Sequence, residues 1–589
     1  MIKKIFINSV SIKKLSFCCF ILWFLTINSA TAITYRVGSG GSAAGCTHNN
    51  IQAAINAGQN QNENINILVT NQHEWFETLS INSPQAMLIQ GGYDNCTTTN
   101  PSDNNSVINA INHPNIPGIE IIDSDFNLGK FQIKNATSSG ITAISSVVEI
   151  TAVLLSHNVS RFGGGLYVRD NSEVRLSQSL VNRNKARNGG GIACSSGSTV
   201  TIEASQVDSN HTYQNEVEGG FGRGGGIHAE NCTLIIQGHP SLGKSLILFN
   251  SAISGGGGIY AGDGMNGGSA ITISDTIIAT NYINHTGAIP VLGGGGIALS
   301  GNDTSLEASN LILARNYSIP FSTVISGGAI YLTEGASFNM KVDKPGNNCG
   351  TNPYTDSTMC SQIAWNITSD SSMIFVDELS TASINQTFIA NNKVNTTHFK
   401  VQLGKIIGTL ALQNNVIKVN GGGNQTTAGV LFQIEGSFFS DFNTFIDNFV
   451  PKLVLGIAAD NLHITRSILI KRPNTLTYSD FLPGSPSNTL FNCLLLNAED
   501  NSLDNGANIL VIPTGGSPFQ TNWPYHIKQD SRAYDMCDRA IPGIALPLSG
   551  DMDNDGSRPP CSGLCSAKHD AGADEYSDFS DLIFENGFG

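Results

Sequence analysis

The segment with the most distinctive chemistry lies near the carboxyl end, where Asp551, Asp553 and Asp555 stand directly before Gly556. Carboxylates at positions one, three and five of a loop, with glycine at position six, supply the oxygen ligands and the turn that a calcium ion needs. The twelfth position is Ser562 instead of glutamate, so the pattern is incomplete. Calcium binding is one interpretation; the other is an aspartate-rich turn held by bonds between side chains and backbone.

A second candidate set is aromatic. Each member stands one residue after an aliphatic side chain that follows a glycine run, and the set is Tyr167, His228, Tyr260 and Tyr331. In a strand, that position points away from the aliphatic one, which predicts a row of rings facing solvent. The row could stack on sugars, although tyrosine also favours strands for packing reasons alone. His228 with Glu230 is a lone pair on this face, whereas glycoside hydrolysis needs two carboxyl groups, so we assign no catalytic residue.

Cysteine usage points to an oxidising compartment. Of the 12 cysteines, two lie in the first 32 residues, which leaves an even number for disulfides. Proximity along the chain predicts three bonds: Cys46 with Cys96, Cys349 with Cys360, and Cys561 with either Cys565 or Cys537. Zinc is the weaker alternative for Cys561 and Cys565, because no matching Cys or His pair lies at ligand spacing.

A repeated element must position these residues. The repeat consists of glycines followed by an aliphatic residue, and it occurs as GGGLYV at Gly163, GGGIAC at Gly189, GGGIHA at Gly224, GGGIYA at Gly256, GGGIAL at Gly294 and GGAIYL at Gly327. Each copy follows an apolar segment that ends in asparagine, at Asn158, Asn184, Asn210, Asn250, Asn281 and Asn316. The intervals of 26 to 38 residues indicate one supersecondary unit stacked on copies of itself.

Alternation after each glycine run identifies the unit as a strand. The aliphatic residue and the residue two positions later, such as Leu166 and Val168, fall on one face. Three short strands per coil of about 25 to 30 residues, with Gly and Asn at the corners, predict a right-handed parallel β-helix, an all-β solenoid. Glycine would accept positive φ and let neighbouring coils approach closely. Asparagine would tolerate the left-handed region and form an amide ladder between coils.

Four regions follow from this pattern. Residues 1–32 have the basic start, apolar centre and Ala-Thr-Ala end of a signal peptide. Residues 33–115 form an N-terminal cap and first coils, with a short helix whose Ile51, Ala54 and Ile55 cover the open end of the solenoid. Residues 116–500 carry the repeats, with an insertion at 344–360, and 501–589 form a C-terminal module and tail. No stretch after the signal is long and apolar enough to span a bilayer as a helix.

Charge excludes one class of partner. The net charge of −15 includes four lysines of the signal segment, so the mature chain would carry −19. An acidic protein of this kind is a poor partner for nucleic acid or anionic membranes. Charged residues make up only 13% of the chain, and Ser, Thr, Asn and Gly provide its polarity. This composition suits an extracellular solenoid with small polar side chains on its faces.

The paired FIANN and GGAIY motifs resemble the repeats of the polymorphic outer membrane proteins and of the wider right-handed β-helix, pectate-lyase-like superfamily. The segments SRAYDMC, DMDNDGSRPP and DAGADEY are similar to bacterial secreted β-helix proteins with a C-terminal anchor-associated region. The resemblance implies a bacterial protein that is secreted or retained at the outer membrane surface. The chain has no room for the translocating barrel of the polymorphic proteins, and it has no paired-aspartate or arginine-rich motif of the enzymes. We therefore expect an exported, non-catalytic, adhesin-like or structural protein that binds glycans or proteins. The alternative is a polysaccharide lyase or glycoside hydrolase.

Overall fold

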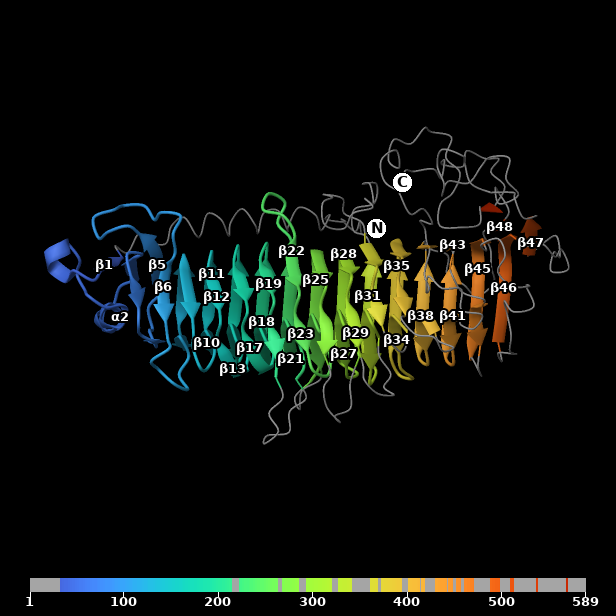
Figure 1. Ribbon diagram of the computed structural model, residues 1–589, viewed down its shortest axis with the longest axis horizontal. Helices are drawn as coiled ribbons and strands as arrows, with labels where there is room; N and C mark the ends of the chain where they lie inside the picture. Colours follow the sequence, from blue (N-terminus) through green and yellow to red (C-terminus); the bar gives the residue numbers. More distant parts are fainter. Residues whose placement is uncertain are drawn as a thin grey trace, which may run out of the picture.

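The computed structural model describes residues 32–213, 222–262, 267–284, 293–319, 327–341, 361–368, 372–394, 401–413, 415–418, 430–441, 443–446, 448, 452–456, 460–470, 488–497, 509–512, 537–538 and 568–569. Short parallel strands stack along one long axis, from the blue end of Figure 1 to the orange end. The predicted parallel β-helix is confirmed. The predicted signal segment and the insertion at 344–360 lie outside the described residues.

Four rows of strands run along the solenoid, and we call them the first to fourth faces in the order in which the chain visits them. The first face comprises β4 (Leu79–Ile81), β7 (Ile119–Ile122), β10 (Ile141–Ile144), β14 (Leu166–Arg169), the start of β18 (Ile192–Glu203) and of β21 (Ile227–Gln237), β24 (Ile259–Gly262), β27 (Ile297–Ser300), β30 (Ile330–Thr333), β34 (Ile374–Val376), β38 (Val401–Ile406), β41 (Val430–Ile434) and β44 (Lys452–Gly456). The second comprises β1 (Ile33–Val37), β2 (Ile65–Thr70), β5 (Met87–Tyr93), β8 (Asp125–Gly129), β11 (Val147–Thr151), β15 (Glu173–Ser177), the ends of β18 and β21, the start of β25 (Ala270–Ala279) and of β28 (Ser305–Ala314), β31 (Ser337–Lys341), β35 (Thr381–Asn385), β39 (Thr409–Gln413), β42 (Ser437–Asp441), and the start of β45 (Asn461–Ile470) and of β46 (Asn488–Asn497).

The third and fourth faces complete each coil. The third comprises β3 (Glu74–Trp75), β6 (Ser106–Asn109), β9 (Phe131–Lys134), β12 (Leu154–Ser156), β16 (Leu180–Asn182), β19 (Gln206–Asp208), β22 (Ser245–Leu248), the ends of β25 and β28, β32 (Ser361–Ala364), β36 (Thr387–Ala390), β40 (Val416–Lys418), β43 (Thr444–Ile446), the ends of β45 and β46, and β47 (Ile509–Ile512). The fourth is a separate sheet of β13 (Val159–Phe162), β17 (Lys185–Asn188), β20 (His211–Thr212), β23 (Ser251–Ala252), β26 (Tyr282–Asn284), β29 (Tyr317–Ile319), β33 (Ile367–Thr368) and β37 (Lys393–Val394). The expectation of three strands per coil is thus wrong for the middle coils, because the residues after each ladder asparagine form a fourth strand.

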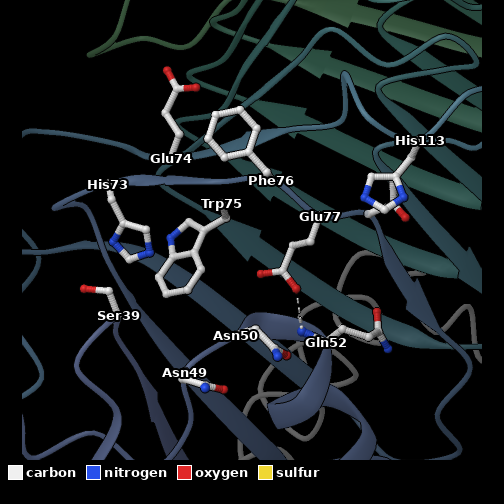
Figure 2. A pocket seen from close by; sticks show the side chains of 11 residues that line it. Ser39, Asn49, Asn50, Gln52, His73, Glu74, Trp75, Phe76, Glu77 and His113 are labelled. Atoms are coloured by element: carbon white, nitrogen blue, oxygen red, sulfur yellow. Dashed lines mark hydrogen bonds between the residues drawn. The ribbon is translucent and has the colours of Figure 1, made fainter. Parts of the chain in front are cut away.

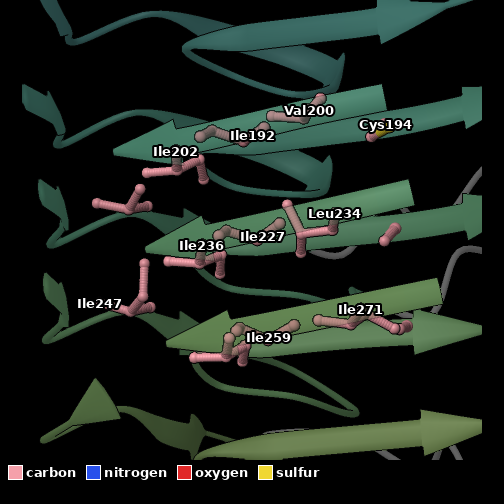
Figure 3. Close-up of a cluster of buried hydrophobic side chains, with 14 of the residues drawn as sticks. Ile192, Cys194, Val200, Ile202, Ile227, Leu234, Ile236, Ile247, Ile259 and Ile271 are labelled. Carbon is pink, nitrogen blue, oxygen red and sulfur yellow. The ribbon is translucent and has the colours of Figure 1, made fainter. Parts of the chain in front are cut away.

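The apolar residues of the first face line the interior as the alternation predicts. Leu166, Ile192, Ile227, Ile259, Ile297 and Ile330 lie in register from coil to coil and are fully buried. Side chains of the second and third faces meet them from across the coil, as Figure 3 shows for Val200, Leu234 and Ile247. Full burial of each such side chain stabilises the fold by about 1.5–3 kcal/mol. The interior stack is therefore the main stabilising feature.

The glycine runs serve both predicted purposes. Gly224 has a φ of +66°, a left-handed conformation that costs glycine little. A Cβ on the next residue, Gly225, would lie 2.4 Å from the carbonyl oxygen of Gly257 in the following coil. Only glycine permits this approach, so the runs are structural.

The asparagines form the expected amide ladder. From Asn158 to Asn366, each buried Nδ2 donates to the Oδ1 of the asparagine in the next coil at 2.9–3.1 Å, and the ladder comprises Asn158, Asn184, Asn210, Asn250, Asn281, Asn316, Asn366 and Asn392. The left-handed residue is not the asparagine but the one before it, with φ of 52–59° at His157, Arg183, Ser209, Phe249, Thr280, Arg315, Trp365 and Asn391. The prediction of left-handed asparagines is wrong by one residue. The turn at the preceding residue directs the amide inward, where it also donates to a backbone carbonyl such as that of Val207.

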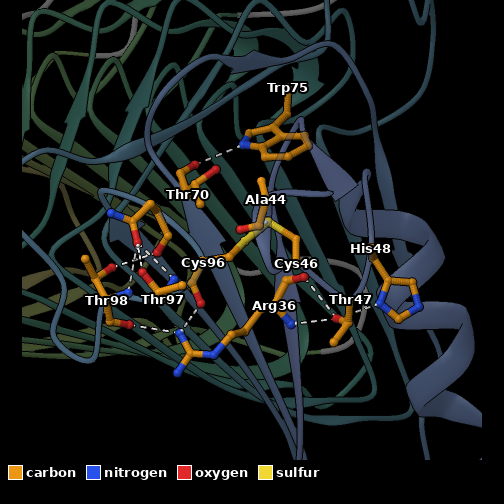
Figure 4. The surroundings of a disulfide bond; sticks show 11 residues. Arg36, Ala44, Cys46, Thr47, His48, Thr70, Trp75, Cys96, Thr97 and Thr98 are labelled. Atoms are coloured by element: carbon orange, nitrogen blue, oxygen red, sulfur yellow. Dashed lines mark hydrogen bonds between the residues drawn. A yellow bond between two sulfur atoms is a disulfide. The ribbon is translucent and has the colours of Figure 1, made fainter. Parts of the chain in front are cut away.

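The amino end is closed by helix α2 (Ile51–Gln59), as predicted. Ile51, Ala54 and Ile55 are fully buried against the first strands. The Asn50 side chain caps the helix by accepting from the Ala53 amide at 2.7 Å. The predicted disulfide between Cys46 and Cys96 joins the segment before the helix to the loop after β5 (Figure 4). The Arg36 guanidinium donates to the Cys96 and Thr98 carbonyls beside it.

A second disulfide, Cys194 with Cys232, was not predicted. Both residues are buried, and the bond links two successive coils where the first face bends into the second. Cys349, Cys360, Cys561 and Cys565 lie outside the described residues. Cys537 belongs to β48 (Cys537–Asp538), which pairs antiparallel with β49 (Lys568–His569).

Candidate functional site

The predicted aromatic row exists in register but does not face solvent. His228 pairs with Tyr260, and Tyr260 is followed by Ala298 and Tyr331 in successive coils. Their exposed fractions are only 4% for His228, 3% for Tyr260 and 8% for Tyr331, and Tyr167 is half-buried. The prediction of an exposed stripe on the first face is therefore wrong. Alternation correctly gave the side of the strand, but it carries no information about what covers that side.

Contacts within the protein occupy these rings. His228 stacks on Tyr260 with ring centroids 5.3 Å apart, and Tyr331 stacks on Phe375 at 5.0 Å. The Arg223 guanidinium lies 4.8 Å from the centroid of the Tyr260 ring and donates to its hydroxyl at 2.8 Å. Burial lowers the pKa of His228 to about 3 and raises that of Tyr331 to about 12. These side chains form a second, smaller core that offers no face to a sugar.

The fourth face presents a different set of side chains. Its strands begin one residue after each ladder asparagine, and the register positions that follow these asparagines are Val159, Lys185, His211, Ser251, Tyr282, Tyr317, Ile367 and Lys393. None of the eight described strands contains aspartate or glutamate. In a chain of net charge −15, this absence sets the fourth face apart.

Cations gather at the start of the fourth face. Arg161, Lys185 and His211 are exposed, and Arg187 is half-buried beside them. The Arg161 guanidinium lies 5.3 Å from the centroid of the Phe162 ring, and the Lys185 Nζ lies 5.4 Å from that of Tyr213 in the next coil. We call Arg161, Lys185 and Arg187 the basic patch.

Tyr213 contacts one member of the basic patch, Lys185. Its hydroxyl donates to the Ser160 carbonyl at 3.0 Å, 53 residues earlier in the chain. The ring therefore reaches back across the intervening coil, where it contacts Lys185. In the next coil, His211 Nδ1 and Ser251 Oγ are 2.7 Å apart, and burial together with the nearby Lys185 lowers the pKa of His211. The imidazole is thus mainly neutral at pH 7, and the charge of the patch comes from Arg and Lys.

Further along the fourth face, Tyr282 and Tyr317 form an aromatic pair. Their rings are parallel within 1° and their centroids lie 4.8 Å apart. Both rings are half-buried, and burial raises the pKa of Tyr317. Each ring covers one face of the other, and each ring also carries a hydroxyl group that can donate or accept a hydrogen bond. These hydroxyl groups could bind the oxygens of a ligand.

A cavity of about 510 Å³ lies at the amino end, between helix α2 and the corner that joins β3 to β4 (Figure 2). It is lined by Ser39, Asn49, Asn50, Gln52, His73, Glu74, Trp75, Phe76, Glu77, Thr78 and His113. Trp75 is buried, whereas 55% of Phe76 is exposed. Sequence reasoning did not identify this cavity, because its residues come from four separate segments.

Both carboxylates of the cavity already have structural partners. Glu74 accepts from Lys134 at 2.6 Å and from Asn109 at 2.9 Å, and these bonds lower its pKa. Glu77 accepts from the Ile51 and Gln52 amides at 2.9 and 3.1 Å, where it caps the helix, although burial raises its pKa overall. Glu74 thus holds Lys134 and Asn109 against the cavity wall, and Glu77 holds the first turn of helix α2.

The described part of the chain contains no candidate metal cluster and no candidate membrane-spanning helix. There, no three His, Cys, Asp or Glu side chains are close enough together to hold a metal ion. Asp551, Asp553 and Asp555 lie outside the described residues, so calcium binding stays a prediction. No described helix has the length and apolar content needed to cross a membrane.

The sequence does contain a signal for the fourth face. The residue after each ladder asparagine lies on it, and the segment Arg183–Arg187 has three cations in five positions.

Comparison with known proteins adds no information about the ligand, because no protein-family model, curated protein or solved structure matches the chain.

Proposed function

We propose that this chain is an exported, non-catalytic β-helix protein that binds glycans along its fourth face. The observation that carries the proposal is the side-chain content of that face, which combines exposed cations with tyrosine hydroxyl groups and has no carboxylate within its described strands. Cations and tyrosine hydroxyls can bind the oxygens of a sugar polymer. The described strands of this face contain no carboxylate that could act as the acid or base of glycoside hydrolysis.

The shape of the solenoid supports binding to a polymer. Register positions recur at the strand spacing of about 4.8 Å, so a face of eight strands offers a line of closely spaced side chains. Weak contacts that repeat along a chain add up to useful affinity. The two described disulfides suit an oxidising location outside the cytosol. Secretion and retention at a bacterial outer membrane are part of the proposal.

The test is to measure binding and turnover on the same glycans. The purified protein is applied to immobilised neutral, uronate-containing and sulfated polysaccharides with calcium present, and the supernatants are analysed for new reducing ends and unsaturated products. We expect retention without product. Turnover that is lost when one carboxylate is replaced would contradict the proposal and identify a lyase or hydrolase instead. Absence of retention on every glycan would also contradict it.

A further inference from the structure

We propose that the cavity at the amino end, between helix α2 and the corner that joins β3 to β4, binds a neutral sugar unit of a glycan. None of its lining residues belongs to the fourth face, so the inference adds a second site to the proposed function and shares only its ligand class. Three features of the cavity support it: its place in the fold, its aromatic wall and its uncharged polar groups.

The fold itself shapes the cavity. β3 pairs with β6 and β4 pairs with β7, so the corner that carries Phe76 stacks on the next corner, which carries His113. Helix α2 contacts β4, and the residues at its start, from Asn49 to Gln52, complete the lining. The resulting volume of about 510 Å³ falls within the roughly 300–1,000 Å³ of small-molecule sites. A sugar unit is small enough to enter such a space.

Aromatic rings form one wall of the cavity. Trp75 is buried, and its indole donates to the Thr70 carbonyl at 3.3 Å. The His73 ring lies against Trp75, with ring centroids 3.9 Å apart (Figure 2). Phe76 differs from these packed rings, because 55% of its area is exposed to solvent. An exposed ring of this kind can pack against the apolar face of a sugar ring.

Uncharged polar groups complete the site. Asn50 uses its Oδ1 to accept from the Ala53 amide, which leaves its Nδ2 to donate to a ligand. Asn49 and Ser39 also line the cavity and are exposed. In the view of Figure 2, Asn49 and Asn50 lie below the Trp75 indole, next to the start of helix α2. Amide and hydroxyl groups suit the hydroxyl groups of a sugar, each of which both donates and accepts.

The charges of the cavity select against acidic sugars. Its lining residues include Glu74 and Glu77 but no lysine or arginine. Glu74 is paired with Lys134, and Glu77 accepts from two backbone amides at the start of helix α2, so both charges are offset within the protein. Burial lowers the pKa of His73, so its imidazole is mainly neutral at pH 7. A uronate or sulfate group would therefore meet carboxylates without a lysine or arginine partner, whereas a neutral sugar would not be repelled.

Binding of short oligosaccharides to the purified full chain tests the inference. Cellotetraose, maltotetraose, mannotetraose and galactotetraose are compared with tetragalacturonate by saturation-transfer NMR and calorimetry. We expect at least one neutral tetrasaccharide to bind at least tenfold more tightly than tetragalacturonate. Because the contacts are uncharged, raising NaCl from about 50 to 200 mM should change that affinity by less than about twofold.

Matched substitutions locate the site. Phe76→Ala should weaken binding of the neutral tetrasaccharide at least tenfold, whereas Phe76→Tyr, which keeps the ring, should stay within about twofold of wild type. Phe249→Ala is the control, because Phe249 is 50% exposed and does not line the cavity. Asn49→Ala should weaken binding roughly fivefold, the loss expected for one hydrogen bond. Hydrogen exchange checks that each variant keeps the fold of the wild type.

Several outcomes would overturn the inference. Equal or tighter binding of tetragalacturonate, no binding of any neutral tetrasaccharide, or equal effects of Phe76→Ala and Phe249→Ala would each do so.

The double variant Tyr282→Ala/Tyr317→Ala separates this inference from the proposed function, since both residues lie on the fourth face. If the double variant loses retention on polysaccharides while Phe76→Ala keeps it, and no tetrasaccharide binds, the cavity site is refuted and the proposed function stands. Retention that depends only on Phe76 would refute binding along the fourth face and support the cavity site. Failure to bind any glycan would refute both.

Discussion

The amide ladder permits a quantitative prediction at Asn250, which is fully buried. Its Nδ2 donates to Asn281 Oδ1 at 3.0 Å and to the Val207 carbonyl at 2.9 Å. Its Oδ1 accepts from the backbone amide and from the Nδ2 of Asn210, both at 3.0 Å. Replacement by alanine would remove all four bonds and leave several buried polar groups with fewer partners.

The expected cost follows from those groups. A buried donor or acceptor left unpaired costs about 1–3 kcal/mol. Two of the groups keep one partner each. Asn210 Nδ2 still donates to the Val181 carbonyl, and Asn281 Oδ1 still accepts from the backbone amide of residue 250. We therefore expect Asn250→Ala to lower the free energy of unfolding by about 3–6 kcal/mol.

Hydrogen exchange is the appropriate assay, because a solenoid need not unfold as a single unit. Amides of the coil around Asn250 should exchange faster in the variant, while those near helix α2 keep their protection. Asn284→Ala is the control, because Asn284 is exposed on the same solenoid. If the two variants differ by less than about 1 kcal/mol, the ladder is not a major source of stability.

Three further results are expected. Gly225→Ala should severely destabilise the fold, because the added Cβ would lie 2.4 Å from a carbonyl oxygen of the next coil. Gly243→Ala is the control: its Cβ would meet nothing within 4 Å, so it should cost only the strain of a left-handed φ. Thermal melting and soluble yield compare the two variants. Replacing Cys46 and Cys96 by serine should loosen the amino end by about 4 kcal/mol on the chain-entropy estimate for a separation of 50 residues, and limited proteolysis of that end would detect it. Burial holds the pKa of His228 near 3, below its value in the unfolded chain, so the unfolded chain binds a proton more readily than the folded one. The free energy of unfolding should therefore fall as the pH drops from about 6.5 towards 3. Urea midpoints across this range should show a weaker pH dependence in His228→Gln, and an unchanged dependence would refute the assignment.

The repeat made most of the interior predictable. Alternation identified the inward residues, such as Ile227, and the asparagine spacing identified the ladder, because both depend only on local geometry that each coil repeats. The amino-terminal helix and the bond between Cys46 and Cys96 were also predicted, since both lie in short, self-contained segments.

The remaining features depend on relations between coils that one sequence does not display. Tyr260 is outward but buried, because Arg223, 37 residues earlier, lies against its ring. Cys194 occupies a position of the repeat that is aliphatic in other coils and points inward, so the sequence predicted a core residue there. In the structure it forms a disulfide with Cys232. Of the candidate site, the sequence predicted an exposed aromatic stripe on the first face, where the rings of His228, Tyr260 and Tyr331 are buried.

The one-way pattern of the ladder also bears on how the length of such a protein can change. Every rung donates from one coil to the next in the same sense, so each coil supplies one acceptor to its predecessor and one donor to its successor. Removing or duplicating a whole coil, such as the 26 residues from Val159 to Asn184, therefore reconnects the ladder without leaving an unmatched asparagine amide. The solenoid can gain or lose length in units of one coil, with its fourth face shortened or extended by one strand each time. The length of surface that contacts a ligand could thus vary among descendants of this sequence, while the cross-section of the solenoid stays constant.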